Sequence, residues 1–190
     1  MPGLLAPIKY WQLDNEADLH YKHRGSGDFD NPNECFQVLR MTYEELKIAD
    51  PEVRLMINLA GLGKGIDIAN QYLQDLIDLS ALNYFDILSY HVYPTSYKFT
   101  EVMNFFNTMQ ILVGEKPVWI KETAVTSKGV NGFEDSLIAN EANQAIWLIK
   151  NFLYHAASGV RKVLWLNHED FTPSVNNLLK YGGLMTFHII

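Results

Sequence analysis

Apolar positions along this chain form two patterns, short continuous runs and longer stretches in which apolar residues repeat every three or four positions. Runs of four to nine mostly apolar, β-branched or aromatic residues are typical of buried strands. Repeats of three to four are typical of helices with one buried face. The expected strands lie within residues 8–16, 53–59, 84–94, 116–123 and 160–168.

Amphipathic helices are expected in each of the four intervals between these strands. The first begins near Asn33 and ends at Asp50-Pro51, since proline cannot continue a helix. The expected buried faces are Phe36, Leu39, Tyr43 and Leu46; then Ile68, Tyr72, Leu73, Leu76, Ile77 and Leu79; then Val102, Phe105, Phe106, Met109 and Leu112; and last Ala142, Ala145, Ile149, Phe152, Leu153 and Ala156.

Strands that alternate with helices, without hairpin signals between them, predict right-handed βαβ crossovers and a parallel sheet. At this repeat length, eight units would need about 300 residues, which is within the range of (β/α)8 barrels. No internal repeat or linker interrupts the pattern. We therefore expect residues 1–190 to form a single α/β domain, or most of one.

Two of the expected strands end in a carboxylate. The run Ile-Lys-Tyr-Trp-Gln-Leu leads to Asp14-Asn15-Glu16, and Pro-Val-Trp-Ile-Lys leads to Glu122. Ligands of parallel α/β sheets bind beyond the carboxyl ends of the strands. Two carboxylates at such ends are the minimum needed to cleave a glycosidic bond.

Alternation along the second of these strands puts Val118, Ile120 and Glu122 on one face, and Trp119 and Lys121 on the other. If Val118 and Ile120 fill the interior of a barrel, Glu122 continues their row at its open end. Trp119 is then expected to pack against a helix.

The segments Trp-Gln-Leu-Asp-Asn-Glu and Pro-Val-Trp-Ile-Lys-Glu-Thr together resemble the retaining glycoside hydrolases of clan A, the cellulase, β-xylosidase and mannanase superfamily. The resemblance extends over nearly the whole chain. It implies a partial (β/α)8 barrel, with strands 4 to 8 and outer helices present and strands 1 to 3 missing. A chain that lacks those strands is expected to be inactive alone, and another chain could supply them.

The resemblance also implies roles for individual residues. Glu16 would be the acid/base after strand 4, and Glu122 the nucleophile on strand 7. Asn15 would bind the sugar 2-hydroxyl. His91 and Tyr93 match a His-x-Tyr pair on strand 6 whose tyrosine holds the nucleophile, and Trp165 matches an aromatic platform under the sugar ring. The pattern implies an oligo- or polysaccharide substrate and no cofactor. Lys121 and Asp14 depart from it, because the family more often has small, hydroxylated or apolar residues there.

Other interpretations of these residues remain open. Each glutamate could form a surface ion pair with a nearby lysine, Asn15 could be a turn residue, and His91 and Tyr93 could be a buried structural pair. The chain could also be a non-catalytic half-barrel that binds carbohydrate. A nucleotide-binding domain is disfavoured, because the glycines of residues 61–65 fit neither the Rossmann nor the Walker spacing. They are expected to form a flexible loop at the barrel mouth.

Metal binding is not predicted. His20 and His23, in the polar stretch of residues 17–33, have the spacing of metal ligands, but no carboxylate or thiol completes the set. They are expected at the polar rim of a sugar cleft. The single cysteine, Cys35, matches no zinc spacing and is expected to be an inert core thiol.

Composition narrows the classes of function. The chain has 190 residues, is 48% hydrophobic and carries a net charge of −7 without clustered lysine or arginine, which argues against nucleic-acid binding. No apolar run approaches the roughly 20 residues of a membrane span. The N-terminus lacks the basic residues of a signal peptide, but a truncated start would leave the compartment open.

Overall fold

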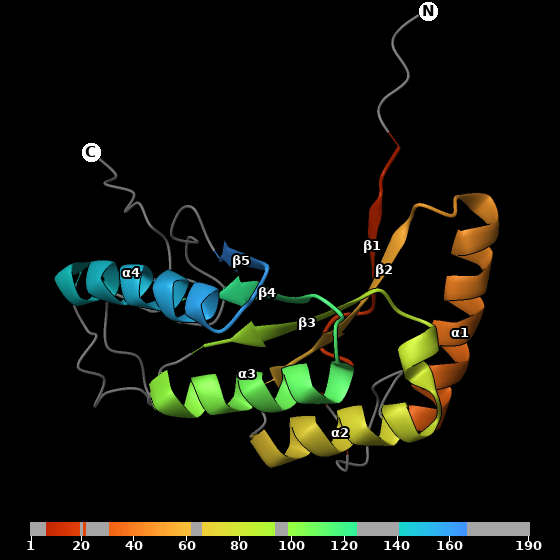
Figure 1. Cartoon of the computed structure of the whole chain (residues 1–190), viewed down its shortest axis with the longest axis horizontal. Coiled ribbons are helices and arrows are strands. Elements are labelled where there is room, and N and C mark those ends of the chain that lie inside the picture. The colour runs from red at the N-terminus through yellow and green to blue at the C-terminus, as the bar shows by residue number, and fades with distance from the viewer. Residues whose placement is uncertain are drawn as a thin grey trace, which may run out of the picture.

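The computed structural model describes residues 7–19, 21, 31–61, 66–93, 99–124 and 141–166. They contain one five-stranded sheet in the order β1-β2-β3-β4-β5, and every neighbouring pair is parallel (Figure 1). Its strands are β1 (Tyr10–Leu13), β2 (Arg54–Leu59), β3 (Ile87–Val92), β4 (Val118–Thr123) and β5 (Lys162–Trp165). The predicted sequential parallel sheet is confirmed.

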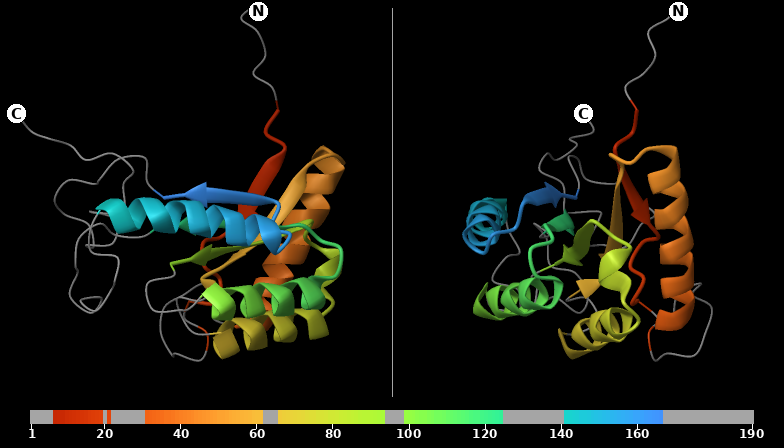
Figure 2. Two further views of the ribbon diagram at one scale, coloured as in Figure 1. Left: turned by 60° about the vertical axis from the view of Figure 1, so that its left-hand side comes forward. Right: turned by 45° about the vertical axis from the view of Figure 1, so that its right-hand side comes forward.

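Four helices connect consecutive strands and lie around the outer side of the curved sheet (Figure 2). They are α1 (Pro32–Ala49), α2 (Ile66–Asp78), α3 (Phe99–Val113) and α4 (Glu141–Ala157), with a short 3-10 helix, η2 (Ala81–Asn83), before β3. A right-handed crossover between parallel strands produces this arrangement, because each helix must pack back onto the sheet.

Local sequence fixes both ends of α1. The side chain of Asn31 accepts a hydrogen bond from the backbone N–H of Asn33, and Pro32 occupies the first turn, where its missing N–H costs nothing. At the other end Asp50 is extended, and Pro51 follows it. The predicted start and end of this helix are therefore confirmed.

The main core lies between the sheet and helices α1, α2 and α3. The predicted faces of α2 and α3 supply Tyr72, Leu76, Phe105 and Met109, all of them buried. Leu39 of α1 is also buried, and the rest of its predicted face is partly buried against the same cluster. The buried side chains of the sheet in this core are Leu55, Ile57, Leu59, Leu88, Tyr90, Val92, Val118 and Ile120.

The prediction for the faces of β4 was wrong. Val118 and Ile120 belong to the helix-side core, whereas Trp119 lies in a separate cluster with Met56 and Ile87. The inner face of the sheet, opposite the helices, is thus lined by Trp119 rather than by Val118 and Ile120. Periodicity separated Trp119 from Val118 and Ile120 correctly, but both faces are apolar here, so the sequence did not indicate which one faced the helices.

The predicted buried face of α4 was also wrong. Its buried residues are Gln144, Asn151 and His155. The Asn151 amide donates to the hydroxyl of Thr123 on β4 at 2.7 Å, and the His155 ring packs edge-on against Phe106. These contacts turn the polar stripe of α4 toward the sheet. The predicted apolar face is consequently exposed: Ala142, Ala145, Ile149, Phe152, Leu153 and Ala156.

Cys35 is fully buried on α1, and burial raises the pKa of its thiol to about 11. A thiol that stays protonated is a poor nucleophile and a poor metal ligand. The expectation of a core thiol is confirmed, and the inertness of Cys35 stays a prediction. Within the described residues, none of the helices is long and apolar enough to cross a membrane.

Candidate active site

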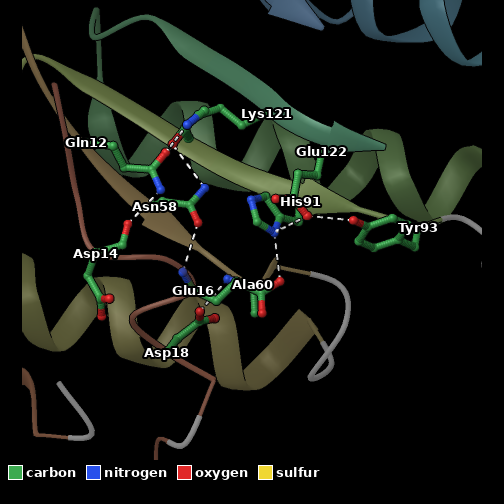
Figure 3. Close-up of polar contacts among 11 residues, drawn as sticks. Gln12, Asp14, Glu16, Asp18, Asn58, Ala60, His91, Tyr93, Lys121 and Glu122 are labelled. Carbon is green, nitrogen blue, oxygen red and sulfur yellow. Dashed lines mark hydrogen bonds and ion pairs between the residues drawn. The ribbon is translucent and has the colours of Figure 1, made fainter. Parts of the chain in front are cut away.

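Four of the predicted site residues meet on the inner face, at the carboxyl end of the sheet (Figure 3). The Nδ1 atom of His91 lies 2.7 Å from Oε1 of Glu16 and 3.1 Å from Oε2 of Glu122. The hydroxyl of Tyr93 donates to the same Oε2 atom of Glu122 at 2.6 Å. Side chains from three separate parts of the chain therefore form one hydrogen-bonded cluster.

The shared histidine nitrogen limits the distance between the two carboxylates. Two oxygens that both lie within about 3 Å of one atom are at most about 6 Å apart, a limit that includes the spacing of about 5–5.5 Å used in retaining glycosidases. His91 is almost fully buried, whereas the side chains of Glu16 and Glu122 are 21% and 29% exposed. The imidazole is thus covered, while both carboxylates remain accessible to a ligand.

Tyr93 acts as a hydrogen-bond donor to Glu122. Burial, the hydrogen bond to Glu122 and the negative charge of that carboxylate together raise the pKa of Tyr93 well above its ordinary value. A phenol that keeps its proton holds one oxygen of Glu122 in place. This bond leaves the other oxygen of Glu122 able to act on a ligand.

An irregularity in β4 turns Glu122 toward the inner face. Ile120 pairs with Tyr90, but the next paired residues are Glu122 and His91, so Lys121 is an extra residue in β4. The pairing with β5 shifts at the same point, between Ile120 and Thr123. A β-bulge of this kind redirects the side chains that follow it, and bulges often lie beside active sites. Glu122 therefore faces inward although Ile120 faces the helices.

Glu16 follows β1 in a tight turn with unusual backbone geometry. Its φ is 57° and that of Asp14 is 51°, both in the left-handed region that residues other than glycine rarely adopt. Such conformations persist only where surrounding contacts hold them, and they concentrate at functional sites. The backbone N–H of Glu16 donates to Oδ1 of Asn58 on β2 at 2.9 Å.

Two predicted site residues are not brought into this cluster. Asn15 is exposed and makes no hydrogen bond to Glu16, His91 or Glu122. Trp165 pairs with Thr123, which accepts the hydrogen bond from α4, so register puts Trp165 on the helix-covered face. The sugar-binding roles of Asn15 and Trp165 remain predictions.

A polar layer that sequence analysis missed lies next to the cluster on the inner face. The ammonium of Lys121 donates to the side-chain oxygen of Gln12, and Gln12 donates to the backbone of Asp14 at 2.6 Å. The Asn58 amide donates to Ser89 at 3.1 Å. The missed signal was the polar side chain of Asn58 or Ser89 inside an otherwise apolar strand.

Asp18, two residues after Glu16, is a third carboxylate near the cluster. It is fully buried, and Oδ1 accepts a hydrogen bond from the backbone N–H of Ala60. Burial is the main reason that its pKa rises to about 6, and the charge of Glu16 adds to the rise. Its Oδ2 atom is buried without a hydrogen-bond partner. Asp18 lies in the polar stretch of residues 17–33, where nothing in the sequence distinguishes it.

The opposite end of the inner face has different chemistry. The rings of Tyr10 and Trp119 lie 5.2 Å apart, and the ammonium of Lys162 lies 4.1 Å from the centre of the Trp119 ring. A cavity of about 430 Å³ opens there, lined also by Arg54 and Arg161. The predicted packing of Trp119 against a helix was therefore wrong.

The described residues contain no group of three or more histidine, cysteine or acidic side chains arranged to hold a metal. His20 and His23 lie outside the described residues, as does most of the glycine-rich loop, residues 62–65. Their predicted places at the rim of the cleft remain predictions.

The solved structures that this chain resembles in fold include glycoside hydrolases. The GH53 catalytic domain from Ignisphaera aggregans has a TM-score of 0.66 at 16% identity, over 91% of this chain and 53% of that one. A glycoside hydrolase family 17 β-1,3-glucanosyltransferase from Rhizomucor miehei has a TM-score of 0.60 at 16% identity, over 83% and 55% of the two chains. An endo-laminarinase from Formosa Hel1_33_131 has a TM-score of 0.62 at 20% identity, over 94% and 55%.

At these identities the similarity establishes the fold, that of a TIM-barrel glycoside hydrolase, and confirms the predicted partial barrel. The chain spans about half the length of each of these three structures. No curated protein is significantly similar to it in sequence.

The sequence profile of the family described as "Glycosyl hydrolase catalytic core" matches residues 33–187. The match includes β2 to β5, and with them His91, Tyr93 and Glu122. Glu16 lies before the matched region, and its contact with His91 joins it to the matched residues in space. This chain belongs to the glycosyl hydrolase catalytic core family.

Proposed function

We propose that this chain carries the catalytic carboxylates of a retaining glycoside hydrolase, with Glu16 as the acid/base and Glu122 as the nucleophile. The observation that supports this most is the position of His91 Nδ1, within hydrogen-bond distance of both carboxylates. A retaining mechanism needs two carboxyl groups about 5–5.5 Å apart on opposite sides of the scissile bond.

In the first step Glu122 attacks the anomeric carbon while Glu16 protonates the departing glycosidic oxygen. This forms a covalent ester between the sugar and Glu122 and releases the aglycone. In the second step Glu16 takes a proton from water, which attacks the anomeric carbon and releases Glu122. Two inversions give net retention of configuration.

The surrounding residues support the different roles of the two carboxylates. Tyr93 donates to one oxygen of Glu122 and so holds the carboxylate in place, as a nucleophile requires. Glu16 is hydrogen-bonded to the buried His91 and is itself 21% exposed, which leaves its carboxyl accessible to a departing glycosidic oxygen.

The proposed substrate is a β-linked polysaccharide, with β-1,3-glucan as the first to test. The β-1,3-glucanosyltransferase and the endo-laminarinase, both similar in fold, favour this class.

The proposal applies to a barrel in which further strands complete the open sheet. β1 and β5 form the edges of the described sheet, and Tyr10, Trp11 and Leu164 on these strands are 49%, 45% and 48% exposed. Exposed apolar edges favour pairing with additional strands. A half-barrel that is complemented by another chain is therefore the second candidate function.

We call this chain, joined to three preceding βα units, the completed barrel.

The test is the configuration of the first sugar released. The completed barrel is incubated with a β-1,3-glucan oligosaccharide, and the anomeric protons of the product are followed by NMR from the first minutes. We expect the β-anomer to appear first and then to equilibrate with the α-anomer. Initial release of the α-anomer would show inversion and overturn the assignment of Glu122 as nucleophile.

A further inference from the structure

The turn that carries Glu16 is attached to the end of β2 by hydrogen bonds running in both directions (Figure 3). The N–H of Glu16 donates to the side chain of Asn58 at 2.9 Å, and the N–H of Ala17 donates to the backbone carbonyl of Asn58 at 3.0 Å. In return, the N–H of Ala60 donates to the carboxylate of Asp18. Asn58 thus receives two consecutive N–H groups of this turn.

The side-chain amide of Asn58 has one orientation that satisfies its neighbours. Ser89 Oγ donates its proton to the carbonyl of Ile57 at 3.1 Å, so it can only accept from Asn58. The Nδ2 group of Asn58 must therefore face Ser89, which leaves Oδ1 facing the N–H of Glu16. Asn58 and Ser89 are both fully buried, so water does not compete for these bonds.

We propose that Asn58 is a positioning residue that holds Glu16 in its left-handed backbone conformation and so directs its carboxylate to His91 and Glu122. This inference rests on the proposed role of Glu16. A glutamate gains nothing intrinsically from a φ of 57°, so an outside contact must favour it. Without the acceptor on Asn58, the N–H of Glu16 would be unpaired and the turn would relax toward ordinary φ values, moving the side chain away from His91.

The consequence would appear first at His91. Its Nδ1 lies 2.7 Å from Glu16 and 3.1 Å from Glu122, so Glu16 is the nearer of its two partners. An Nδ1 proton held between two carboxylates gives a strongly downfield NMR signal. That signal reports the position of Glu16 without requiring any turnover.

The experiment compares the His91 Nδ1–H signal in four forms of the 190-residue chain. We expect Asn58→Leu, which has similar size and no acceptor, to move the signal to the position found in Glu16→Ala. Asn58→Asp keeps an acceptor for Glu16 and is expected to retain the wild-type position. Should Asn58→Leu fail to fold, Asn58→Ser replaces it, because its hydroxyl is too short to reach Glu16 and the same shift is expected. A wild-type signal in a folded Asn58→Leu or Asn58→Ser would overturn the inference.

Kinetics on the completed barrel separate this inference from the proposed function. Loss of correctly directed acid catalysis should lower kcat/KM about 10²-fold for a phenyl glycoside. The kcat/KM for a dinitrophenyl glycoside, whose leaving group needs no proton, should be almost unaffected by Asn58→Leu. If the His91 signal shifts as expected but the completed barrel has no glycosidase activity, the proposed function fails and the positioning by Asn58 stands. If both glycosides are affected equally, Asn58 does not act through the acid, and the inference fails.

Discussion

The two ends of the inner face of the sheet are built differently. At the carboxyl end, Glu16, His91, Glu122 and Tyr93 are joined by hydrogen bonds that this chain supplies itself. At the amino end, aromatic rings and cations surround a cavity of about 430 Å³. The first end is already ordered around its polar groups, whereas the second leaves a volume that other side chains or a ligand can fill.

The two ends therefore differ in their dependence on the missing part of a barrel. The hydrogen bonds of the carboxyl end run between β1, β2, β3 and β4 and do not need any further strand. The amino end contains Trp119, only 9% exposed, but also Tyr10, 49% exposed on the edge strand. Changes at the carboxyl end should therefore affect activity, and changes at the amino end should affect stability.

The largest expected effect is from Glu122→Ala in the completed barrel. Removing a nucleophile should lower kcat by at least about 10⁴-fold, as for other catalytic groups that act as a unit. Added azide should restore turnover of an activated aryl β-glycoside and give the α-glycosyl azide. Glu115→Ala, an exposed carboxylate just before β4, is the control and should retain full activity. Comparable activity in the two variants would contradict the role of Glu122.

Trp119→Ala should reduce the free energy of unfolding by about 3 kcal/mol, as for other large-to-small changes of buried aromatic residues. The ring loses its contacts with Met56, Ile87 and Tyr10 and leaves a hole on the inner face. Urea unfolding of the 190-residue chain measures the change. Trp11→Ala, at a half-exposed position on β1, should cost much less. Equal losses of unfolding free energy in the two variants would contradict a specific contribution of the Trp119 cluster to stability.

Asp18→Asn should make stability less dependent on pH. The folded-state pKa of Asp18 is about 6 against 3.8 for the free side chain, so the wild-type protein loses stability as pH rises from about 4 to 6. The full loss corresponds to about 3 kcal/mol at most. The variant cannot ionise and avoids this loss. Its melting temperature relative to wild type should therefore rise between pH 4 and pH 7, and a constant difference would contradict the burial of an ionisable Asp18.

The smallest expected effect is from Lys162→Met. Lys162 lies over the rings of Trp119 and Tyr10 at 4.1 and 4.8 Å, and such a partly exposed cation–π contact is worth about 0.5–1 kcal/mol. Lys162→Arg keeps the charge over the rings and should preserve stability. The denaturation midpoints of the two variants are compared. Equal midpoints would show that the positive charge of residue 162 does not stabilise the amino end of the sheet.

The sequence predicted the strands, the helices and the carboxylate-bearing ends well, because these follow from local periodicity and composition. The sequence-based prediction failed for the direction in which side chains of β4 and α4 point. In β4 the extra residue Lys121 brings Glu122 to the inner face, and strict alternation cannot foresee an inserted residue. In α4 the polar residues Asn151 and His155 are buried, and Asn151 donates to Thr123 of β4. The apolar stripe of α4 alone could not indicate this contact, because Thr123 lies 28 residues away along the chain.

The candidate site shows the same division. Glu16, Glu122, His91 and Tyr93 could be chosen from short motifs, because each lies at the end of a recognisable strand. The contributions of Asn58 and Asp18 depend on how the turn after β1 meets the end of β2. This is a tertiary contact, and the only sign of it in the sequence was the polar side chain of Asn58 within an apolar strand.

The most direct measurement of the central claim is covalent trapping of the nucleophile. The completed barrel is treated with a 2-deoxy-2-fluoro-β-glucosyl fluoride, which slows hydrolysis of a glycosyl-enzyme ester, and is then digested and analysed by mass spectrometry. We predict a single labelled peptide, with the sugar attached to Glu122 and no label in the Glu122→Ala variant. A sugar attached to Glu16, or to any other residue, would contradict the account.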